Sequence, residues 1–218
     1  MNELRTRLVG SLLGALLLVG CSSSGPGGYA GGGGRSAADD FDAGSGKPPS
    51  AKTLYAMGRV LEAKGQTLQA EMMYVRAVHA DREFVPAYCD LAQLQMREGR
   101  VKDAIETLGA ALEVRPKDTV LLNDLGMCWL GRGDYEQALG CFTEAAALLP
   151  ENARYRSNMA VALGMQGRYE ESLALYSQVL PLGEAYHNVA VLCEARRDTE
   201  QAKWHRSRSA ALGYRGDS

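Results

Sequence analysis

The chain has 218 residues and carries 24 basic against 26 acidic side chains, which gives a formal net charge of −2. Proteins that bind nucleic-acid phosphates usually carry an excess of positive charge, so this balance gives no reason to expect a nucleic-acid partner. Aromatic residues make up only 7% of the chain while Ala and Leu are abundant, a composition that favours helices.

The first twenty residues have the pattern of a secretory signal peptide. Arg5 and Arg7 supply a positive start, and an apolar run of twelve residues extends from Leu8 to Val19. A helix of that length spans about 18 Å, whereas crossing a bilayer takes about twenty apolar residues. We therefore expect residues 1–20 to be a cleaved signal and not a permanent membrane span.

The end of this segment, Leu18-Val19-Gly20-Cys21, resembles the lipobox of bacterial lipoproteins. The resemblance implies that Cys21 becomes the mature N-terminus and carries covalent diacylglycerol and an N-acyl chain, with no other cofactor. Two or three acyl chains anchor a protein stably to a membrane. Ser22 stands where an Asp would resemble an inner-membrane retention signal, so we expect the periplasmic face of the outer membrane. The alternative is an ordinary signal peptide with a chance cysteine.

Residues 21–50 are expected to form the lipidated cysteine and a flexible linker. Nine of the 29 residues from Ser22 to Ser50 are Gly, and the apolar side chains are too few to offset the entropy of ordering. A Gly-rich chain of this length averages roughly 30 Å from end to end. The linker would hold the rest of the chain near a bilayer surface.

From Ala51 onward the sequence repeats with a period of 34 residues that shortens once to 30. One column of small residues contains Gly58, Ala92, Gly126, Ala160 and Ala190, and a second contains Ala70, Ala104, Ala138, Ser172 and Ala202. A bulky column contains Tyr74, Leu108, Phe142 and Tyr176 and breaks at Arg206. The middle of each unit is marked by Gly65, Gly99, Gly133, Gly167 and, in the fifth, Arg197. Such self-similarity indicates a stacked array of equivalent units.

Each unit is predicted to be two helices joined at the central Gly, for example Thr119 to Arg132 and Tyr135 to Leu148. The small columns let the two backbones approach, and we expect the bulky residue to fill the gap toward the next unit. Pro116 and Pro150 fall between units, where a missing backbone N–H is tolerated. Pro181 should end the second helix of the fourth unit about one turn early.

The period and the columns resemble the tetratricopeptide repeat. The third unit matches the family at Leu122, Leu125, Gly126, Trp129, Gly133, Tyr135, Ala138, Phe142, Ala145 and Pro150. The resemblance implies an all-α fold, a right-handed α-solenoid of about five helix-turn-helix repeats over residues 51–218. The expected repeats cover residues 51–84, 85–118, 119–152, 153–182 and 183–214. Arg82 departs from the family pattern, because it stands where the inter-repeat proline belongs.

The last predicted helix is the most polar one. Its basic cluster consists of Lys203, His205, Arg206 and Arg208. The terminal helix of a solenoid needs an outer face that water can wet, so we interpret this cluster as a cap. A docking patch for acidic partners is the alternative.

The sequence shows no pattern typical of a catalytic or metal site, and we expect no enzymatic activity. The motifs HExxH, GxxxxGK[ST], GxSxG and CxxC are absent. His79 and His205 lie in different repeats without a partner at ligand spacing, so we expect both at the surface. Cys128 and Cys141 fall on paired helices, where a disulfide is possible in an oxidising compartment; buried free thiols are the alternative.

The resemblance places a partner-binding groove on the first helices of the repeats. The family's groove positions correspond here to Tyr55, Arg59, Gln93, Arg97, Asn123, Met127, Arg154, Ser157, Asn158, Val161, His187 and Asn188. Amides can bond an extended peptide backbone, and arginine can bind carboxylates. Local capping or bonding within the hairpins is the alternative role for Asn158 and Asn188.

These features together predict a membrane-anchored scaffold that binds other proteins and no small-molecule substrate. The segment from Ala153 to Tyr176 resembles the repeats of the TadD lipoproteins of tight-adherence (Flp) pilus systems. That resemblance implies a role in assembling a pilus or secretion machine, with secretin or pilus-assembly components as partners. Two alternatives remain open, a type IV pilus pilotin of the PilF/PilW kind and an adaptor for peptidoglycan-modifying enzymes.

Overall fold

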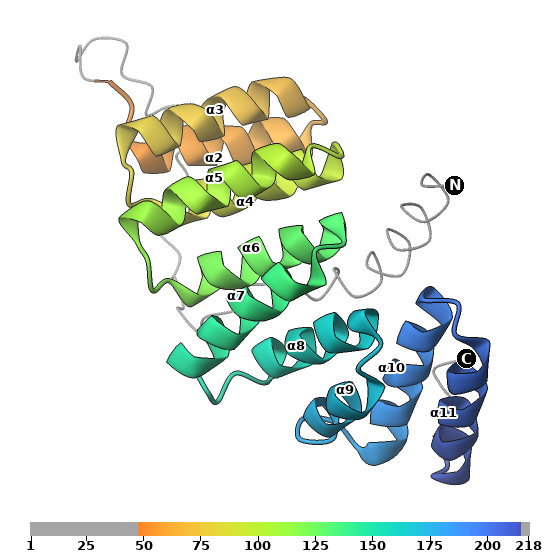
Figure 1. The fold of residues 1–218 in the computed structure, drawn as a ribbon. Coiled ribbons are helices and arrows are strands. Elements are labelled where there is room, and N and C mark those ends of the chain that lie inside the picture. Colours follow the sequence, from red (N-terminus) through yellow and green to blue (C-terminus); the bar gives the residue numbers. More distant parts are fainter. Residues whose placement is uncertain (1–47, 215–218) are drawn as a thin grey trace, which may run out of the picture.

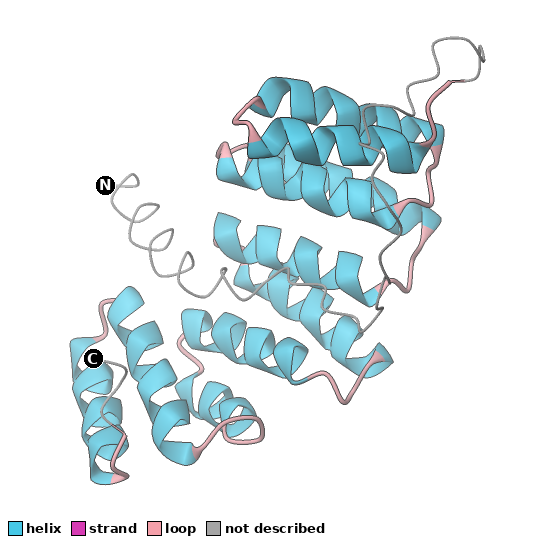
Figure 2. Ribbon diagram, turned by 180° about the vertical axis from the view of Figure 1, so that it is seen from behind, coloured by secondary structure: helices cyan, strands magenta, loops and turns pink. Residues whose placement is uncertain are grey.

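A computed structural model describes residues 48–214, and within this range every regular element is an α-helix (Figures 1 and 2). The ten helices of the described range are α2 (Ala51–Ala63), α3 (Thr67–Ala80), α4 (Val85–Arg97), α5 (Val101–Val114), α6 (Thr119–Arg132), α7 (Tyr135–Leu148), α8 (Ala153–Gln166), α9 (Tyr169–Tyr176), α10 (Leu182–Ala195) and α11 (Thr199–Ala211). They form five antiparallel pairs stacked into a solenoid (Figure 1), which confirms the predicted fold class. None of these helices is long and apolar enough to cross a membrane.

The turn inside each pair depends on one residue in the left-handed backbone conformation. Gly133 ends α6 with a φ of 91°, and Gly167 ends α8 with a φ of 87°. Glycine adopts this conformation without the steric penalty that a Cβ imposes. The fifth repeat has Arg197 at the same place with a φ of 65°, so the turn survives there without its glycine. The predicted position of the turn inside each pair is therefore confirmed.

The small residues of the first helices allow ring contacts inside each hairpin. A Cβ on Gly58 would lie 2.5 Å from Cε1 of Tyr74, and a Cβ on Gly126 would lie 2.5 Å from Cε1 of Phe142. The rings therefore lie directly on the glycine of their own repeat. The sequence predicts that these rings fill the gap toward the next unit. Tyr74 contacts Gly58 of its own hairpin and also packs with Leu94 of the second repeat.

The second helix of the fourth repeat is short, as Pro181 predicted. α9 has 8 residues, whereas α3, α5 and α7 have 14. The chain turns at residues 177–180, and Pro181 becomes the N-cap of α10. Because the missing residues belong to the end of the helix, Tyr176 keeps its buried place in the bulky column.

Consecutive repeats are joined mainly where the second helix of one packs on the first helix of the next, as α3 packs on α4 and α7 on α8. The first helices also touch one another, since α4 contacts α6 and α8 contacts α10. The first helices therefore form an inner row, and the second helices form the outer row. This inner row is the surface on which the predicted groove residues lie.

Candidate functional site

All twelve predicted groove residues lie on first helices, but they differ in how much of each side chain is accessible. Arg59 on α2, Arg97 on α4 and Arg154 on α8 are exposed. Asn123 and Val161 are buried, with 7% and 6% of their surface exposed. The half-buried members are Tyr55, Gln93, Met127, Ser157, Asn158, His187 and Asn188. The three arginines are thus the most accessible part of the predicted groove.

The inner row carries polar contacts between consecutive repeats. The hydroxyl of Tyr55 donates to Oδ2 of Asp90 over 2.9 Å, and Arg59 Nη1 donates to the Tyr55 hydroxyl over 3.1 Å. Arg59 also lies 3.5 Å from the Asp90 carboxylate. Burial raises the pKa of Asp90, while the hydroxyl and the guanidinium act in the opposite direction.

The same connection recurs in the following repeats. The thiol of Cys89 donates to Asp124, and Nδ2 of Asn158 donates to Oδ1 of Asn123 over 2.7 Å. The partners in each pair, including Tyr55 with Asp90, are 35 positions apart, one more than the repeat period. We call these three contacts, Tyr55–Asp90, Cys89–Asp124 and Asn123–Asn158, the polar ladder. They fix one first helix against the next.

A second contact of this kind joins the first two repeats. Arg97 is ion-paired with Glu62, and the Tyr74 hydroxyl donates to the other carboxylate oxygen of Glu62 over 2.5 Å. The guanidinium therefore has a structural partner, although its side chain is still about half exposed. Arg97 would therefore contact a ligand while it keeps its ion pair with Glu62, which joins α2 to α4.

The polar ladder changes the interpretation of two predicted groove residues. Asn123 and Asn158 bond to each other, so their amides are used within the protein. Val161 belongs to the largest apolar core cluster and offers no side chain to a partner. The sequence alternative of local capping was also incomplete, because the bond joins two repeats.

Sequence reasoning missed two acidic members of the inner row, Asp90 and Asp124. They belong to a column that also contains Ala56, Asn158 and Asn188, with the same steps of 34, 34, 34 and 30 residues. That column was readable from the sequence, but its inter-repeat bonds were not. Asp124 is almost wholly buried, which raises the pKa of its carboxyl, and its Oδ2 atom has no hydrogen-bond partner within the described residues.

The C-terminal end of the inner row is covered by the chain itself. The ring of Tyr214 lies 5.2 Å from that of His187, and its Cβ approaches Gly183. Tyr214 therefore covers part of the inner row at α10, where His187 is half-buried.

The predicted surface position of His205 is wrong, although that of His79 is confirmed. His205 is only 3% exposed and packs among Tyr169, Tyr186 and Trp204. The other basic residues of α11 are exposed. Lys203 and Arg206 are ion-paired with Glu200 and Glu194, and Arg208 lies over Trp204. This exposed polar surface agrees with a cap.

None of the four cysteines in the described residues forms a disulfide. Burial raises the pKa of the Cys128 thiol to about 12 and that of Cys141 to about 11, so both stay protonated near neutral pH. These thiols therefore behave as small apolar groups. The predicted signal peptide, linker and lipidated Cys21 lie outside the described residues.

Two family models, both described as "Tetratricopeptide repeat", match residues 61–125 and 129–187. Together they span more than half of the chain. Human Superkiller complex protein 3 is 34% identical over 91 residues, which cover 42% of this chain and 6% of that protein. Mouse Tetratricopeptide repeat protein 16 is 26% identical over 156 residues, covering 68% of this chain and 20% of that protein. The chain thus spans a small part of these relatives.

Mouse Protein O-mannosyl-transferase TMTC1 is 26% identical over 140 residues, which cover 15% of that protein. Two solved structures share the fold. A crystal structure of MamA has a TM-score of 0.56 at 19% identity, covering 71% of this chain and 92% of that one. A tetratricopeptide repeat protein from Parabacteroides merdae has a TM-score of 0.60 at 16% identity, covering 74% of this chain and 66% of that one.

Five stacked hairpins, the column spacing and the family matches agree with one another. The fold is that of a generally non-catalytic scaffold for protein–protein interactions. The chain belongs to the tetratricopeptide-repeat family.

Proposed function

We propose that this protein is a lipid-anchored scaffold of the bacterial envelope, where its inner row of helices binds a component of a tight-adherence (Flp) pilus or secretion machine. The anchor is Cys21, and the Gly-rich linker from Ser22 to Ser50 connects it to the first repeat. The lipobox-like residues and the resemblance to TadD repeats support this proposal. The structure contributes the surface that would bind the partner.

One observation carries the binding part of the proposal: three arginines stay exposed on an otherwise half-buried inner row. The side chain of Arg59 is 60% exposed and that of Arg97 is 54% exposed, even though both are paired with carboxylates. Arg154 lies two repeats further along on α8 and is also exposed. Guanidinium groups bind carboxylates in a bidentate geometry, so a partner segment with acidic side chains fits this row.

Arg154 is the residue with which to test the groove. Replacing Arg97 by Glu would oppose Glu62 directly, in an ion pair that joins the first two repeats. Arg154 also acts on a carboxyl of the protein, that of Asp124, so the unfolding transition of Arg154→Glu is compared with that of the wild type before binding is measured. We predict that Arg154→Glu lowers capture of candidate secretin and pilus-assembly components at least tenfold, as loss of a charge-assisted contact with reversal of sign implies. The measurement is pull-down of purified candidates by the full chain.

The matched control is Lys102→Glu on the outer helix α5, since Lys102 is also exposed. This variant should bind like the wild type. Equal capture by the wild type and Arg154→Glu would move the binding site off the inner row. Capture of a peptidoglycan hydrolase or of a type IV pilus secretin in place of tight-adherence components would favour one of the two alternatives.

The anchor has its own test. Cys21→Ser removes the thiol that would carry diacylglycerol, so we predict that the variant leaves the membrane fraction while the wild type sediments with it. A Cys21→Ser chain that sediments with membranes as fully as the wild type in 1 M salt would remove the lipid from the proposal. The groove test would be unaffected by that result, because it uses purified proteins.

A further inference from the structure

The first repeat differs from the other four in the chemistry of its outward surface. Exposed large apolar side chains are concentrated there. Those of α2 are Met57 and Val60, and those of α3 are Leu68, Met72 and Val75. The three on α3 follow one another at spacings of four and three, so they lie on one face of that helix. α2 and α3 form one end of the solenoid (Figure 1).

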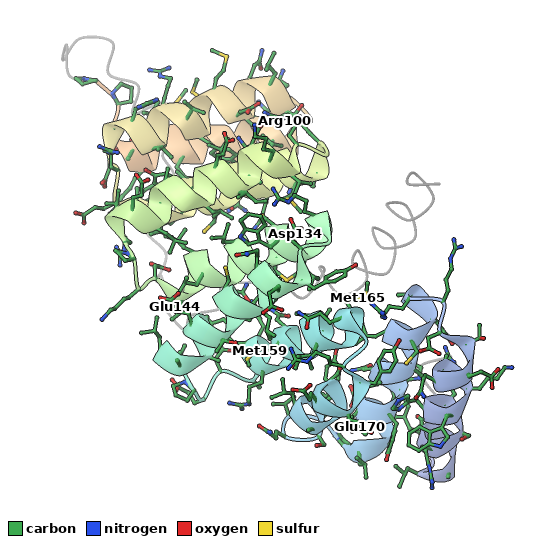
Figure 3. The ribbon with its side chains drawn as sticks, in the orientation of Figure 1. Arg100, Asp134, Glu144, Met159, Met165 and Glu170 are labelled. Atoms are coloured by element: carbon green, nitrogen blue, oxygen red, sulfur yellow. The ribbon has the colours of Figure 1, made fainter. Side chains whose placement is uncertain are left out.

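The position of Val60 is buried in every later repeat, and that of Met57 is buried or partly buried there. Val60 is 51% exposed, whereas its equivalents Leu94, Cys128, Ala162 and Leu192 are at most 6% exposed. Met57 is equivalent to Leu91 and to Met159, which Figure 3 shows at the junction of α7 and α8. In the later repeats these positions lie under the preceding second helix. The first repeat has no preceding helix within the described residues.

The α3 residues occupy positions that are polar or small in most of the other repeats. Leu68, which is 70% exposed, corresponds to Lys102, Glu136, Glu170 and Glu200. Met72 corresponds to Glu106, Gly140, Ala174 and Trp204, and Val75 corresponds to Gly109, Thr143, Ser177 and Ser207. Apolar residues at solvent positions of one repeat mark a contact surface.

Basic side chains predominate on α2 and α3, although the exposed acidic residues Asp81 and Glu83 follow directly after α3. α2 and α3 contain two acidic residues, Glu62 and Glu71, and both are ion-paired with arginines of the second repeat. Arg100, the partner of Glu71 at 2.8 Å, lies at the turn between α4 and α5 (Figure 3). Lys52 and Lys64 of the first repeat are exposed, and they have no ion pair among the described residues. Arg76 and His79 add to this rim and are also exposed.

We propose that the face of α3 formed by Leu68, Met72 and Val75 rests on an anionic lipid bilayer. An interfacial helix binds there by burying apolar side chains at the headgroup boundary while lysine and arginine attract anionic lipids. The inference rests on the proposed function, because the anchor at Cys21 would bring the bilayer within reach. The described residues begin at position 48 and α2 begins at Ala51, so the first repeat is the part of the array closest to Cys21 along the sequence.

Charge decides between a bilayer and a second copy of the chain. A symmetric pair formed through this surface would place Lys52, Lys64 and Arg76 against the same residues of the partner. Glu62 and Glu71 are already ion-paired, so only Asp81 and Glu83 after α3 could offset part of this charge. Such like charges repel, whereas an anionic headgroup layer attracts them. The surface therefore fits a lipid better than it fits itself.

The test places a photo-crosslinking amino acid at position 72 of the full, lipidated chain in vesicles of phosphatidylethanolamine and phosphatidylglycerol. The matched control carries it at position 140, the equivalent exposed site in the third repeat. We expect several-fold more lipid adduct at position 72 than at position 140. The difference should shrink in vesicles of neutral phosphatidylcholine, and also in 1 M salt, where the screening length falls to about 3 Å.

Equal lipid adducts at both positions would overturn the proposal. A product of twice the chain mass at position 72 would assign the surface to a second copy, and an adduct with another envelope protein in native membranes would assign it to that partner. With the probe at position 72, Leu68→Glu together with Val75→Glu should lower the lipid adduct to the level of position 140.

Failure of the anchor is distinguished by sedimentation of the wild-type chain and Cys21→Ser. If neither chain is membrane-bound, the proposed function fails. If the wild type is anchored and position 72 does not touch lipid, only the present inference fails.

Discussion

The two ends of the solenoid differ in the polarity of their outer faces. At the C-terminal end, the positions of α11 that would face another repeat are Lys203, Arg206 and Ala210, where α5 has Ile105, Leu108 and Leu112. At the N-terminal end, Met57 and Val60 keep the apolar character of an inner junction although they are exposed. The terminal repeat of a solenoid needs a polar outer face to stay soluble. The C-terminal end has such a face, whereas the N-terminal end exposes apolar side chains.

This contrast shows that whether a side chain is buried depends more on the neighbouring repeat than on the sequence of its own repeat. Val60 and Leu94 occupy the same position of the same helix type, and only the presence of a preceding helix makes Leu94 a core residue. Three predictions test the contrast between the ends, beginning with the largest expected effect.

The first prediction compares one substitution at both places. Leu94→Glu puts an unpaired carboxylate into the junction of the first two repeats, and we expect a loss of more than about 3 kcal/mol in the free energy of unfolding. Val60→Glu should change this free energy by no more than about 0.5 kcal/mol, because the site is exposed. Urea denaturation followed by circular dichroism measures both. Similar losses for the two variants would mean that the α2 face is covered within the protein.

The second prediction concerns the glycine of the first repeat. Gly58→Ala would bring a Cβ to within 2.5 Å of the Tyr74 ring in its present position. The fourth repeat holds Ala160 beside Tyr176, so the first repeat would have to shift its ring to accept the methyl group. We expect a net loss of about 1–2 kcal/mol, since overpacking outweighs the better helix propensity of Ala.

The control variant gives the first repeat the pair that the second repeat has at these positions, Ala92 with Leu108. In a Tyr74→Leu background, Gly58→Ala should become neutral or stabilising by up to about 1 kcal/mol. A double-mutant cycle measures the coupling. The same loss in both backgrounds would show that the ring is not the reason for the glycine.

The third prediction concerns pH at the C-terminal end. Burial lowers the pKa of His205, which Asp198 opposes only in part. Between the usual imidazole pKa of about 6.5 and this lower value, the unfolded chain binds more protons than the folded one, so stability rises with pH. The fifth repeat should therefore be fully stable above about pH 6.5 and become less stable as the pH falls below it.

Trp204 reports this change, since its ring lies 4.8 Å from that of His205. His205→Leu should remove the pH dependence of the unfolding transition followed by tryptophan fluorescence. The exposed His79 of the first repeat provides the control, and His79→Leu should leave the pH profile unchanged. A profile that survives His205→Leu would assign the titration to another group.

Much of the fold could be predicted from local patterns. The glycine turns, the helix pairs and the short α9 follow from residues close together in the sequence, such as Gly133 and Pro181. The candidate site was predicted less well. Asn123 and Asn158 were correctly placed on first helices, but their mutual bond joins residues 35 positions apart and depends on how two repeats pack. His205 was misplaced for the same kind of reason, because rings from α9 and α10 cover it.

The sequence by itself determined the repeat, the bounds of α6 and α7 and the polar character of α11, because each depends on side chains within one hairpin. Only the tertiary structure decided which inner-row groups are already paired and which apolar residues remain exposed. Arg97 and Glu62 illustrate the first case, and Val60 and Leu94 the second. The physical reason is that accessibility and pairing in a stacked array are set by the neighbouring repeat, which no pattern within one repeat describes.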